Sequence, residues 1–227
     1  RGFSEQGAEN TIEGLEASAA AKADMVEIDV MPTKDGKFVV MHDGNLSRLT
    51  GIFGELKDYT FDELTEMTIT AQYGHTGMLP SLEQYVLRAK ELKMPLLIEV
   101  KLSGAETHDH IDLLVAELEE LEALTPNIYH SLDPASVDRL KELRPDLYVG
   151  YTMAFAGVDV PDTNADFIVV EEWTATEKMQ QDAYDAGLGF MVWTVNGTEG
   201  IREHLRRASD GIITDHPDVA YAERASM

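Results

Sequence analysis

The chain has 227 residues, of which 44% are hydrophobic, enough for one large domain or two small ones with a genuine core. Its 18 basic and 42 acidic residues give a formal net charge of −24, which argues against nucleic acid and against direct adhesion to an anionic membrane surface. Cysteine is absent, which excludes disulfides and thiolate metal sites.

Apolar, strand-like runs alternate with amphipathic, helix-like stretches along the chain. The first helix is predicted to start at Asn10, because Glu13 three residues later completes a capping-box pattern. Strands are predicted at residues 25–31 and 38–42. Residues 44–80 are less regular and rich in glycine and threonine, which indicates an inserted segment.

The second half of the chain continues the alternation. A helix capped by Ser81 leads to a strand at 96–101, and a helix with apolar residues at helical spacing follows over 111–121. Further strands are predicted at 127–131, 147–152, 167–170, 191–195 and 211–214. Further helices are predicted from Asp133-Pro134, over 176–186 and around 201–205.

This alternation predicts an α/β fold with a parallel sheet. Seven strands belong to the series when 38–42 is left aside, and an eighth would lie just before Arg1. We therefore predict a TIM (β/α)₈ barrel with the inserted segment 44–80 and a first strand truncated at the N-terminus. A doubly wound sheet is the alternative, but no glycine-rich nucleotide fingerprint follows any strand. One domain over 1–227, excised from a longer protein, is the expected organisation.

Acidic side chains occur within two of the apolar strands. Glu27 and Asp29 lie two apart and project to one face, as do Glu99 and Lys101. Carboxylates in an apolar strand need compensation, and a divalent cation, Ca²⁺ or Mg²⁺, would provide it. The alternative is a buried ion pair with Arg or Lys, in which Glu99 serves only as the partner of Lys101.

Other polar residues follow the predicted strands, where the active sites of such barrels lie. His42 could move protons near neutral pH, although a lone histidine is more often structural. Arg1 and Lys101 could clamp a phosphate. Glu171 could enter the pocket or be a solvated strand end. Trp193 could contact substrate or pack in the barrel core.

An ordered series of motifs carries a resemblance to a known family, the glycerophosphodiester phosphodiesterases. The match runs over essentially the whole chain. The segments are Arg1-Gly2, Glu9-Asn10-Thr11, Glu27-Ile28-Asp29, Thr33-Lys34-Asp35-Gly36, Val39-Val40-Met41-His42-Asp43, Ile98-Glu99-Val100-Lys101 and Asp210-Gly211-Ile212-Ile213-Thr214-Asp215-His216-Pro217. Residues 73–76 and 165–172 resemble the branch whose catalytic domain follows a multi-pass membrane region and faces outside the cell.

The resemblance implies roles for individual residues. Glu27, Asp29 and Glu99 would bind one divalent cation, Arg1 would contact the phosphate, and His42 would be one of two catalytic histidines. Lys101 would lie near the phosphate, and Trp193 would line the glycerol side. The family's second histidine immediately precedes the Arg-Gly dipeptide, a position before the first residue of this sequence.

The resemblance thus implies a metal-dependent enzyme that hydrolyses glycerophosphodiesters to glycerol phosphate and an alcohol. Deacylated phospholipids and the polyglycerolphosphate of lipoteichoic acid are the candidate substrates. A domain tethered to the membrane and facing outside the cell is expected. The alternatives are a non-catalytic phosphodiester-binding domain, or a related barrel phosphodiesterase of the phospholipase C or sphingomyelinase D type.

Overall fold

A computed structural model describes residues 1–153 and 159–227. The chain divides into two compact units, Arg1–Ile128 and Tyr129–Met227.

The first unit is built around two parallel strands. Strand β1 (Val26–Pro32) pairs in parallel with β5 (Leu96–Val100), and β2 (Phe38–Val40) pairs antiparallel with β1. Every residue of β5 is buried, as is all of β1 except Glu27. Parallel strands covered on both faces read as near-continuous apolar runs, which is why the sequence predicted both.

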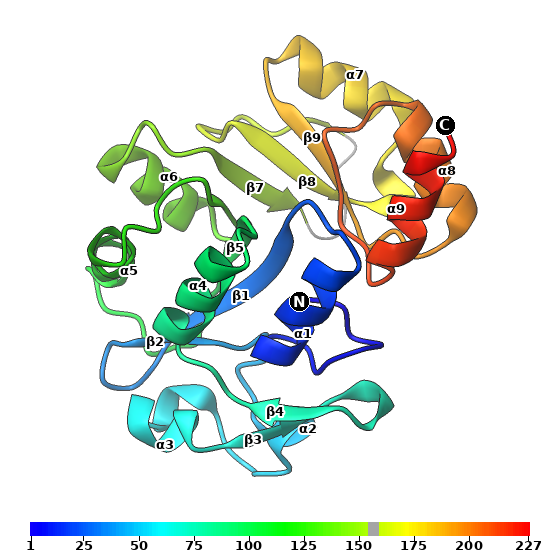
Figure 1. The fold of residues 1–227 in the computed structure, drawn as a ribbon. Helices are drawn as coiled ribbons and strands as arrows, with labels where there is room; N and C mark the ends of the chain where they lie inside the picture. The colour runs from blue at the N-terminus through cyan, green and yellow to red at the C-terminus, as the bar shows by residue number, and fades with distance from the viewer. Residues whose placement is uncertain (154–158) are drawn as a thin grey trace. The chain divides into compact units, whose positions relative to one another are not determined.

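Three helices accompany these strands: α1 (Ile12–Ala20), α4 (Leu82–Glu91) and α5 (His110–Glu120) (Figure 1). The predicted capping box at Ser81 is confirmed, with reciprocal bonds to Gln84. The predicted start of the first helix is wrong by one residue. Thr11 is the cap, accepting from Gly14 N, whereas Asn10 has a left-handed backbone (φ 53°). The reason is that the Asn10 side chain hydrogen-bonds to Asp29.

The inserted segment is more regular than its composition suggested. It forms a chain of short elements: α2 (Ser47–Thr50), η1 (Leu56–Asp58), α3 (Phe61–Thr65), β3 (Thr68–Thr70), η2 (Gln72–Gly74) and β4 (Thr76–Met78). Buried side chains from these elements, including Leu49, Leu56 and Leu64, pack with Met31 and Met41. The segment therefore shares a hydrophobic core with the strands that carry the candidate site.

The second unit is a run of parallel strands with helices between them. Its strands pair in the order β6 (Ile128–Ser131), β7 (Val149–Met153), β8 (Phe167–Glu171), β9 (Gly189–Trp193) and β10 (Gly211–Ile212). The helices are α6 (Pro134–Leu143), α7 (Glu177–Asp185), α8 (Thr198–Arg206) and α9 (Pro217–Ala225), with η3 (Glu172–Thr174) after β8. The α/β class predicted from the sequence is thus present in both units.

Several features of the second unit differ from the predictions, among them the strand expected over 211–214, which ends at Ile212. The sequence placed a strand at 191–195, but β9 ends at Trp193, and Val195 packs in the core that includes Phe190 and Val192. Met191 and Trp193 are half-buried on the other face of β9. Helix α9 was not predicted. The described residues contain no helix that is both long and apolar enough to cross a bilayer.

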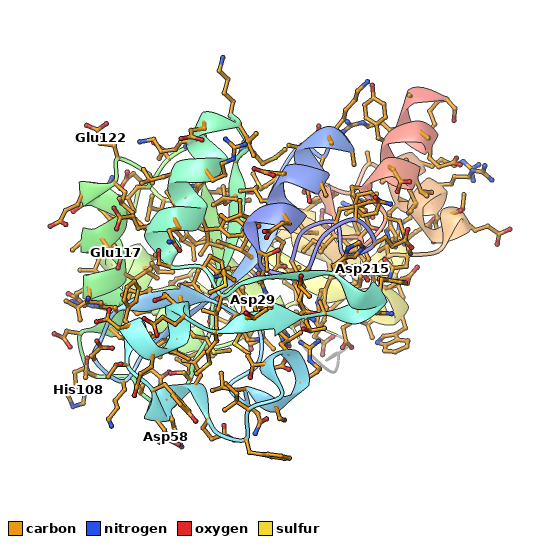
Figure 2. All side chains as sticks on the ribbon, turned by 60° about the horizontal axis from the view of Figure 1, so that its bottom comes forward. Asp29, Asp58, His108, Glu117, Glu122 and Asp215 are labelled. Atoms are coloured by element: carbon orange, nitrogen blue, oxygen red, sulfur yellow. The ribbon has the colours of Figure 1, made fainter. Side chains whose placement is uncertain are left out.

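One helix of the first unit carries an acidic group with a raised pKa. Glu117 of α5, labelled in Figure 2, is partly buried. Burial together with the nearby Glu83 and Glu120 raises its pKa to about 7, while Lys37 lowers it. The folded protein therefore holds this proton more tightly than the unfolded chain does. The contribution of Glu117 to the free energy of unfolding is therefore fully present at low pH and is lost as pH rises from about 4.5 to 7.

We therefore expect Glu117→Gln to raise the free energy of unfolding at pH 8 by about 1 kcal/mol. This is less than the full pKa shift would imply, because solvent screens the exposed part of the side chain. The increase in the free energy of unfolding should become smaller toward pH 5. Urea unfolding at a series of pH values measures it. Glu122→Gln removes the same charge from an exposed residue just beyond the same helix and is the control. Equal effects of the two substitutions at every pH would contradict the assignment.

Candidate active site

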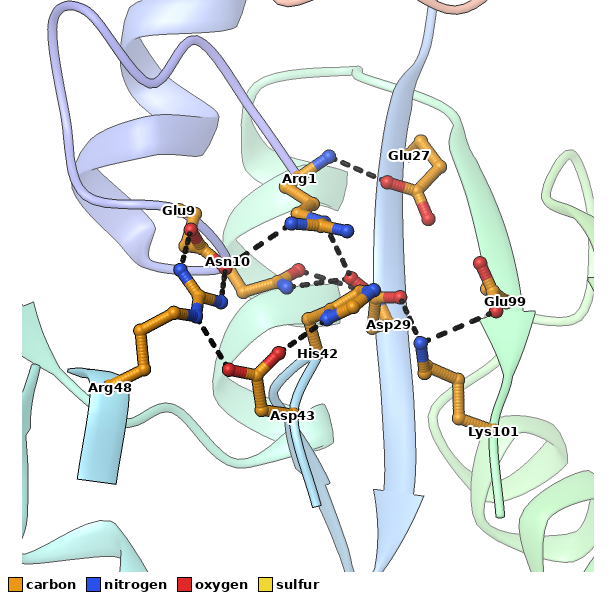
Figure 3. Close-up of polar contacts among 10 residues, drawn as sticks. All are labelled: Arg1, Glu9, Asn10, Glu27, Asp29, His42, Asp43, Arg48, Glu99 and Lys101. Carbon is orange, nitrogen blue, oxygen red and sulfur yellow. Dashed lines mark hydrogen bonds and ion pairs between the residues drawn. The ribbon is translucent and has the colours of Figure 1, made fainter. Parts of the chain in front are cut away.

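Three carboxylates of the first unit converge at β1 and β5. Asp29 and Glu99 are directly paired residues in the parallel register of the two strands, and Glu27 lies two residues before Asp29. A carboxylate oxygen of Glu27 and one of Glu99 lie within 4.8 Å of each other. Asp29 and Glu99 are buried, and Glu27 is nearly so. The fold thus brings together the three acids that the sequence singled out (Figure 3).

Two cationic side chains face this acidic cluster. Lys101 Nζ lies 3.6 Å from Asp29 Oδ1 and 3.6 Å from Glu99 Oε1. Arg1 Nε lies 3.6 Å from Asp29 Oδ2, and the main-chain nitrogen of Arg1 lies 2.6 Å from Glu27 Oε2. Both cations predicted to contact phosphate therefore adjoin the carboxylates. These are also the neighbours that the alternative interpretation, a buried ion pair, requires.

The cations compensate the three acids unequally. Burial opposes the charged form of Asp29, but Lys101 and other positive neighbours, Arg1 among them, hold its pKa below the usual range. Burial raises the pKa of Glu27, and Asp29 adds to that effect. Burial and the charge of Asp29 raise the pKa of Glu99 to about 8, against the opposing effect of Lys101. Further positive charge at this cluster would therefore be stabilising.

The donor set fits a hard cation. Within the described part of the chain, the buried oxygens Asp29 Oδ1 and Glu99 Oε1 accept no hydrogen bond, since Lys101 at 3.6 Å is too distant to donate one. Carboxylate oxygens are the ligands that Ca²⁺ and Mg²⁺ prefer. The residues present are thus compatible with the predicted divalent ion, and the assignment of Glu27, Asp29 and Glu99 as its ligands stays a prediction.

Asn10 holds Asp29 from the other side. Its Nδ2 donates to Asp29 Oδ2 (2.8 Å), and its Oδ1 accepts from the main-chain N–H of Asp29 (3.2 Å). Asparagine tolerates the left-handed backbone that this reach requires. Sequence reasoning assigned Asn10 to a helix start and missed this role, although the Glu9-Asn10-Thr11 motif contained the signal.

His42 lies beside Asp29, and its ring is oriented by the next residue (Figure 3). Met41 N donates to Asp29 O (2.9 Å), which brings the end of β2 against β1. His42 Nδ1 lies 2.6 Å from Asp43 Oδ1. Partial burial alone would raise the pKa of Asp43, but hydrogen bonds with Arg48 and His42 lower it to about 2. An ionised carboxylate only accepts, so Nδ1 carries the proton and Nε2 of the neutral ring has the lone pair.

Burial also affects the His42 ring itself. It lowers the pKa of His42 below the usual value, although Asp29 and Asp43 oppose the shift. The ring is therefore mostly neutral at pH 7, the form in which it can accept a proton.

The two remaining predicted site residues belong to the second unit. Glu171 ends β8 and accepts from Trp173 Nε1 (2.8 Å). Trp193 ends β9 on its half-buried face, and its Nε1 has no hydrogen-bond partner among the described residues. Their predicted contact with substrate stays a prediction.

A histidine with a fixed tautomer, a cluster of buried carboxylates and two cations are the groups expected of an enzyme that cleaves an anionic ester. Comparison with known proteins supplies the family. The chain belongs to the Glycerophosphoryl diester phosphodiesterase family, whose sequence model matches residues 1–219. The predicted enzyme class, a glycerophosphodiester phosphodiesterase, is thereby confirmed.

Individual relatives agree with this membership. YhdW of Bacillus subtilis is 30% identical over 229 residues that cover 96% of this chain and 93% of YhdW. A glycerophosphodiester phosphodiesterase of Bacillus altitudinis is 28% identical and covers 100% of this chain, with 97% of its own length matched. A phosphodiesterase of Oleispira antarctica, solved with its product sn-glycerol-3-phosphate, superposes with a TM-score of 0.87 at 22% identity, covering 98% of this chain and 94% of that one.

The structural likeness confirms the predicted TIM-barrel fold and excludes the doubly wound alternative. The family match likewise favours glycerophosphodiester phosphodiesterases over the phospholipase C and sphingomyelinase D alternatives. The organisation of residues 1–227 as one domain stays a prediction.

Proposed function

We propose that this chain hydrolyses soluble glycerophosphodiesters to sn-glycerol 3-phosphate and an alcohol, with a divalent cation bound by Glu27, Asp29 and Glu99. The observation that carries the proposal is the placement of His42, with Nδ1 held by Asp43, beside Asp29 of the acidic cluster. The product bound to the Oleispira antarctica relative supports glycerol phosphate as the product here.

His42 acts as the general base in this scheme. Its Nε2 takes the proton of a glycerol hydroxyl as the oxygen attacks phosphorus, and the ester bond to the alcohol breaks as the leaving oxygen takes a proton from a general acid, the role that the family resemblance gives to the histidine immediately before the Arg-Gly dipeptide. Water then opens the cyclic glycerol phosphate: its proton passes to that second group, and His42 returns its own proton to the ring-opened hydroxyl. Proton transfer by a positioned group contributes roughly 10²–10⁴ in rate.

Arg1 and Lys101 hold the phosphate oxygens. Lys101 lies between Asp29 and Glu99, and Arg1 lies between Glu9 and Asp29, so both are oriented by carboxylates before substrate binds. Fixed positive groups aimed at developing charge commonly contribute the largest share of rate enhancement. A bound divalent ion would add Lewis-acid stabilisation of the phosphoryl oxygens.

The substrate class is tested with a panel of diesters. The panel comprises glycerophosphocholine, glycerophosphoglycerol, polyglycerolphosphate and an intact lysophospholipid. Each is tested with Mg²⁺ or Ca²⁺ on protein made from the full-length gene. We expect release of glycerol phosphate from the small diesters, measured with a glycerol-3-phosphate dehydrogenase. Release from the polymer would extend the proposal to lipoteichoic acid. Binding without turnover of any diester would instead establish the non-catalytic alternative.

A further inference from the structure

Arg48 of the inserted segment makes three hydrogen bonds to two acids next to the site. Its Nε donates to Asp43 Oδ2 (2.5 Å), its Nη1 to Glu9 Oε2 (2.9 Å) and its Nη2 to Glu9 Oε1 (2.8 Å). The bond pair to Glu9 is the bidentate geometry that only a planar guanidinium provides. Arg48 itself is partly exposed, whereas Glu9 is buried.

The bond to Asp43 determines how that carboxylate can hold His42. One oxygen of Asp43 faces Arg48 and the other faces His42 Nδ1, so the group is held at both ends. Without Arg48 the Asp43 carboxylate is free to rotate toward water. The bond that keeps the proton on His42 Nδ1 would then weaken.

The hydrogen bonds from Arg48 to Glu9 connect it to the loop that contains Asn10. Glu9 precedes Asn10, which holds Asp29 by two hydrogen bonds. Arg1 Nη1 also lies 3.7 Å from Glu9 Oε1. Arg48 therefore ties the histidine side of the cluster to the loop that carries Arg1 and Asn10.

We propose that Arg48 is a positioning residue of this enzyme, acting through Asp43 to hold the Nδ1–H tautomer of His42 and leave Nε2 available as the base. The inference rests on the proposed function for its kinetic consequence only. The tautomer itself is a property of the protein without substrate. Among the described residues, Arg48 hydrogen-bonds to Asp43 and Glu9, and not to the acidic cluster or to the cations proposed to hold the phosphate. Its loss is therefore expected to change turnover rather than substrate binding.

The test compares Arg48→Ala and Arg48→Lys with a matched control. Arg88→Ala removes an arginine of similar exposure from α4, where it pairs with Glu16 and Glu91, away from the candidate site. The kinetic measurement is kcat and KM for glycerophosphocholine. The structural measurement is the ¹⁵N NMR spectrum of the His42 ring in its neutral form, assigned by comparison with His42→Gln. Circular dichroism establishes that each variant is folded.

We expect Arg48→Ala to lower kcat roughly 10–100-fold, the usual effect of losing a group that orients a functional histidine, with KM little changed. The Nδ1–H tautomer, dominant in the wild type, should lose population to the Nε2–H tautomer. Arg48→Lys should recover part of kcat and part of the Nδ1–H population, because an ammonium can donate to Asp43 but cannot also bind Glu9 in the bidentate mode. Arg88→Ala should change neither measurement.

An unchanged tautomer in folded Arg48→Ala overturns the proposal, whatever happens to kcat. So does an unchanged kcat, or an equal loss of kcat in Arg88→Ala. If Arg48→Ala does not fold because Glu9 is left buried and unpaired, the same two measurements are made on Arg48→Lys. A kcat and a tautomer population equal to those of the wild type would then overturn the proposal. If the wild type turns over no diester, the proposed function fails, while the NMR comparison still tests the role of Arg48.

Discussion

Replacing His42 by glutamine is expected to lower kcat roughly 10²–10⁴-fold while the fold is retained. The side chain is partly exposed, and its one hydrogen bond among the described residues is to the adjacent Asp43, so little of the core depends on it. Glutamine keeps a polar group of similar reach but cannot accept and return a proton. Steady-state kinetics with glycerophosphocholine measures the loss, and thermal unfolding shows whether the protein remains folded.

His108→Gln is the control for this substitution. His108 lies in the same unit, on the exposed stretch before α5, and the change there should leave kcat unaffected (Figure 2). Full activity in folded His42→Gln would exclude His42 as the base. Equal losses in the two variants would point to a general effect of removing histidine instead.

The second large effect is expected from the divalent ion. We predict that the chain binds one Mg²⁺ or Ca²⁺, and that binding stabilises the fold by about 2.7 kcal/mol at a free ion concentration 100 times Kd. The physical reason is the incomplete compensation of Glu27 and Glu99, whose pKa values are raised by burial and by the charge of Asp29. Calorimetric titration of metal-stripped protein gives Kd and stoichiometry, and unfolding with and without the ion gives the stabilisation.

Glu99→Gln and Glu27→Gln should each weaken this binding roughly tenfold or more, because each removes one charge from an all-oxygen site whose affinity depends on ligand charge. Glu117→Gln is the control, since it removes a charge from α5 of the same unit without touching the cluster. Activity of stripped wild-type protein should return on adding the ion. A titration without saturable binding, or unweakened binding in both cluster variants, would favour the buried ion-pair interpretation.

Much of the fold was predictable because buried parallel strands have a plain signature. Residues 25–31 and 96–101 match β1 and β5 to within one residue at each end. The short elements of the inserted segment were missed because helices of four or five residues and strands of three carry too little periodicity to be recognised. Their stability comes from the shared core with Met31 and Met41 instead.

The candidate site was predictable only in part. That Glu27 and Asp29 share a face follows from the two-residue period of any strand. That Asp29 stands opposite Glu99 depends on the register of β1 against β5, which neither strand specifies alone. Asn10 carried a helix-cap pattern that local chemistry favours. The bonds to Asp29 prevail over that pattern, and the backbone takes the left-handed conformation instead.

The sequence by itself determined the α/β class, the acidic and basic residues from which the site is built, and the family they resemble. Only the tertiary structure revealed Arg48, because its partner Glu9 lies 39 positions away in an unrelated stretch of the chain. Such contacts depend on how the inserted segment packs against the strands, a property of the assembled core. Local patterns extend over a few residues, whereas the hydrogen bonds that orient His42 and Asp29 join segments brought together by burial.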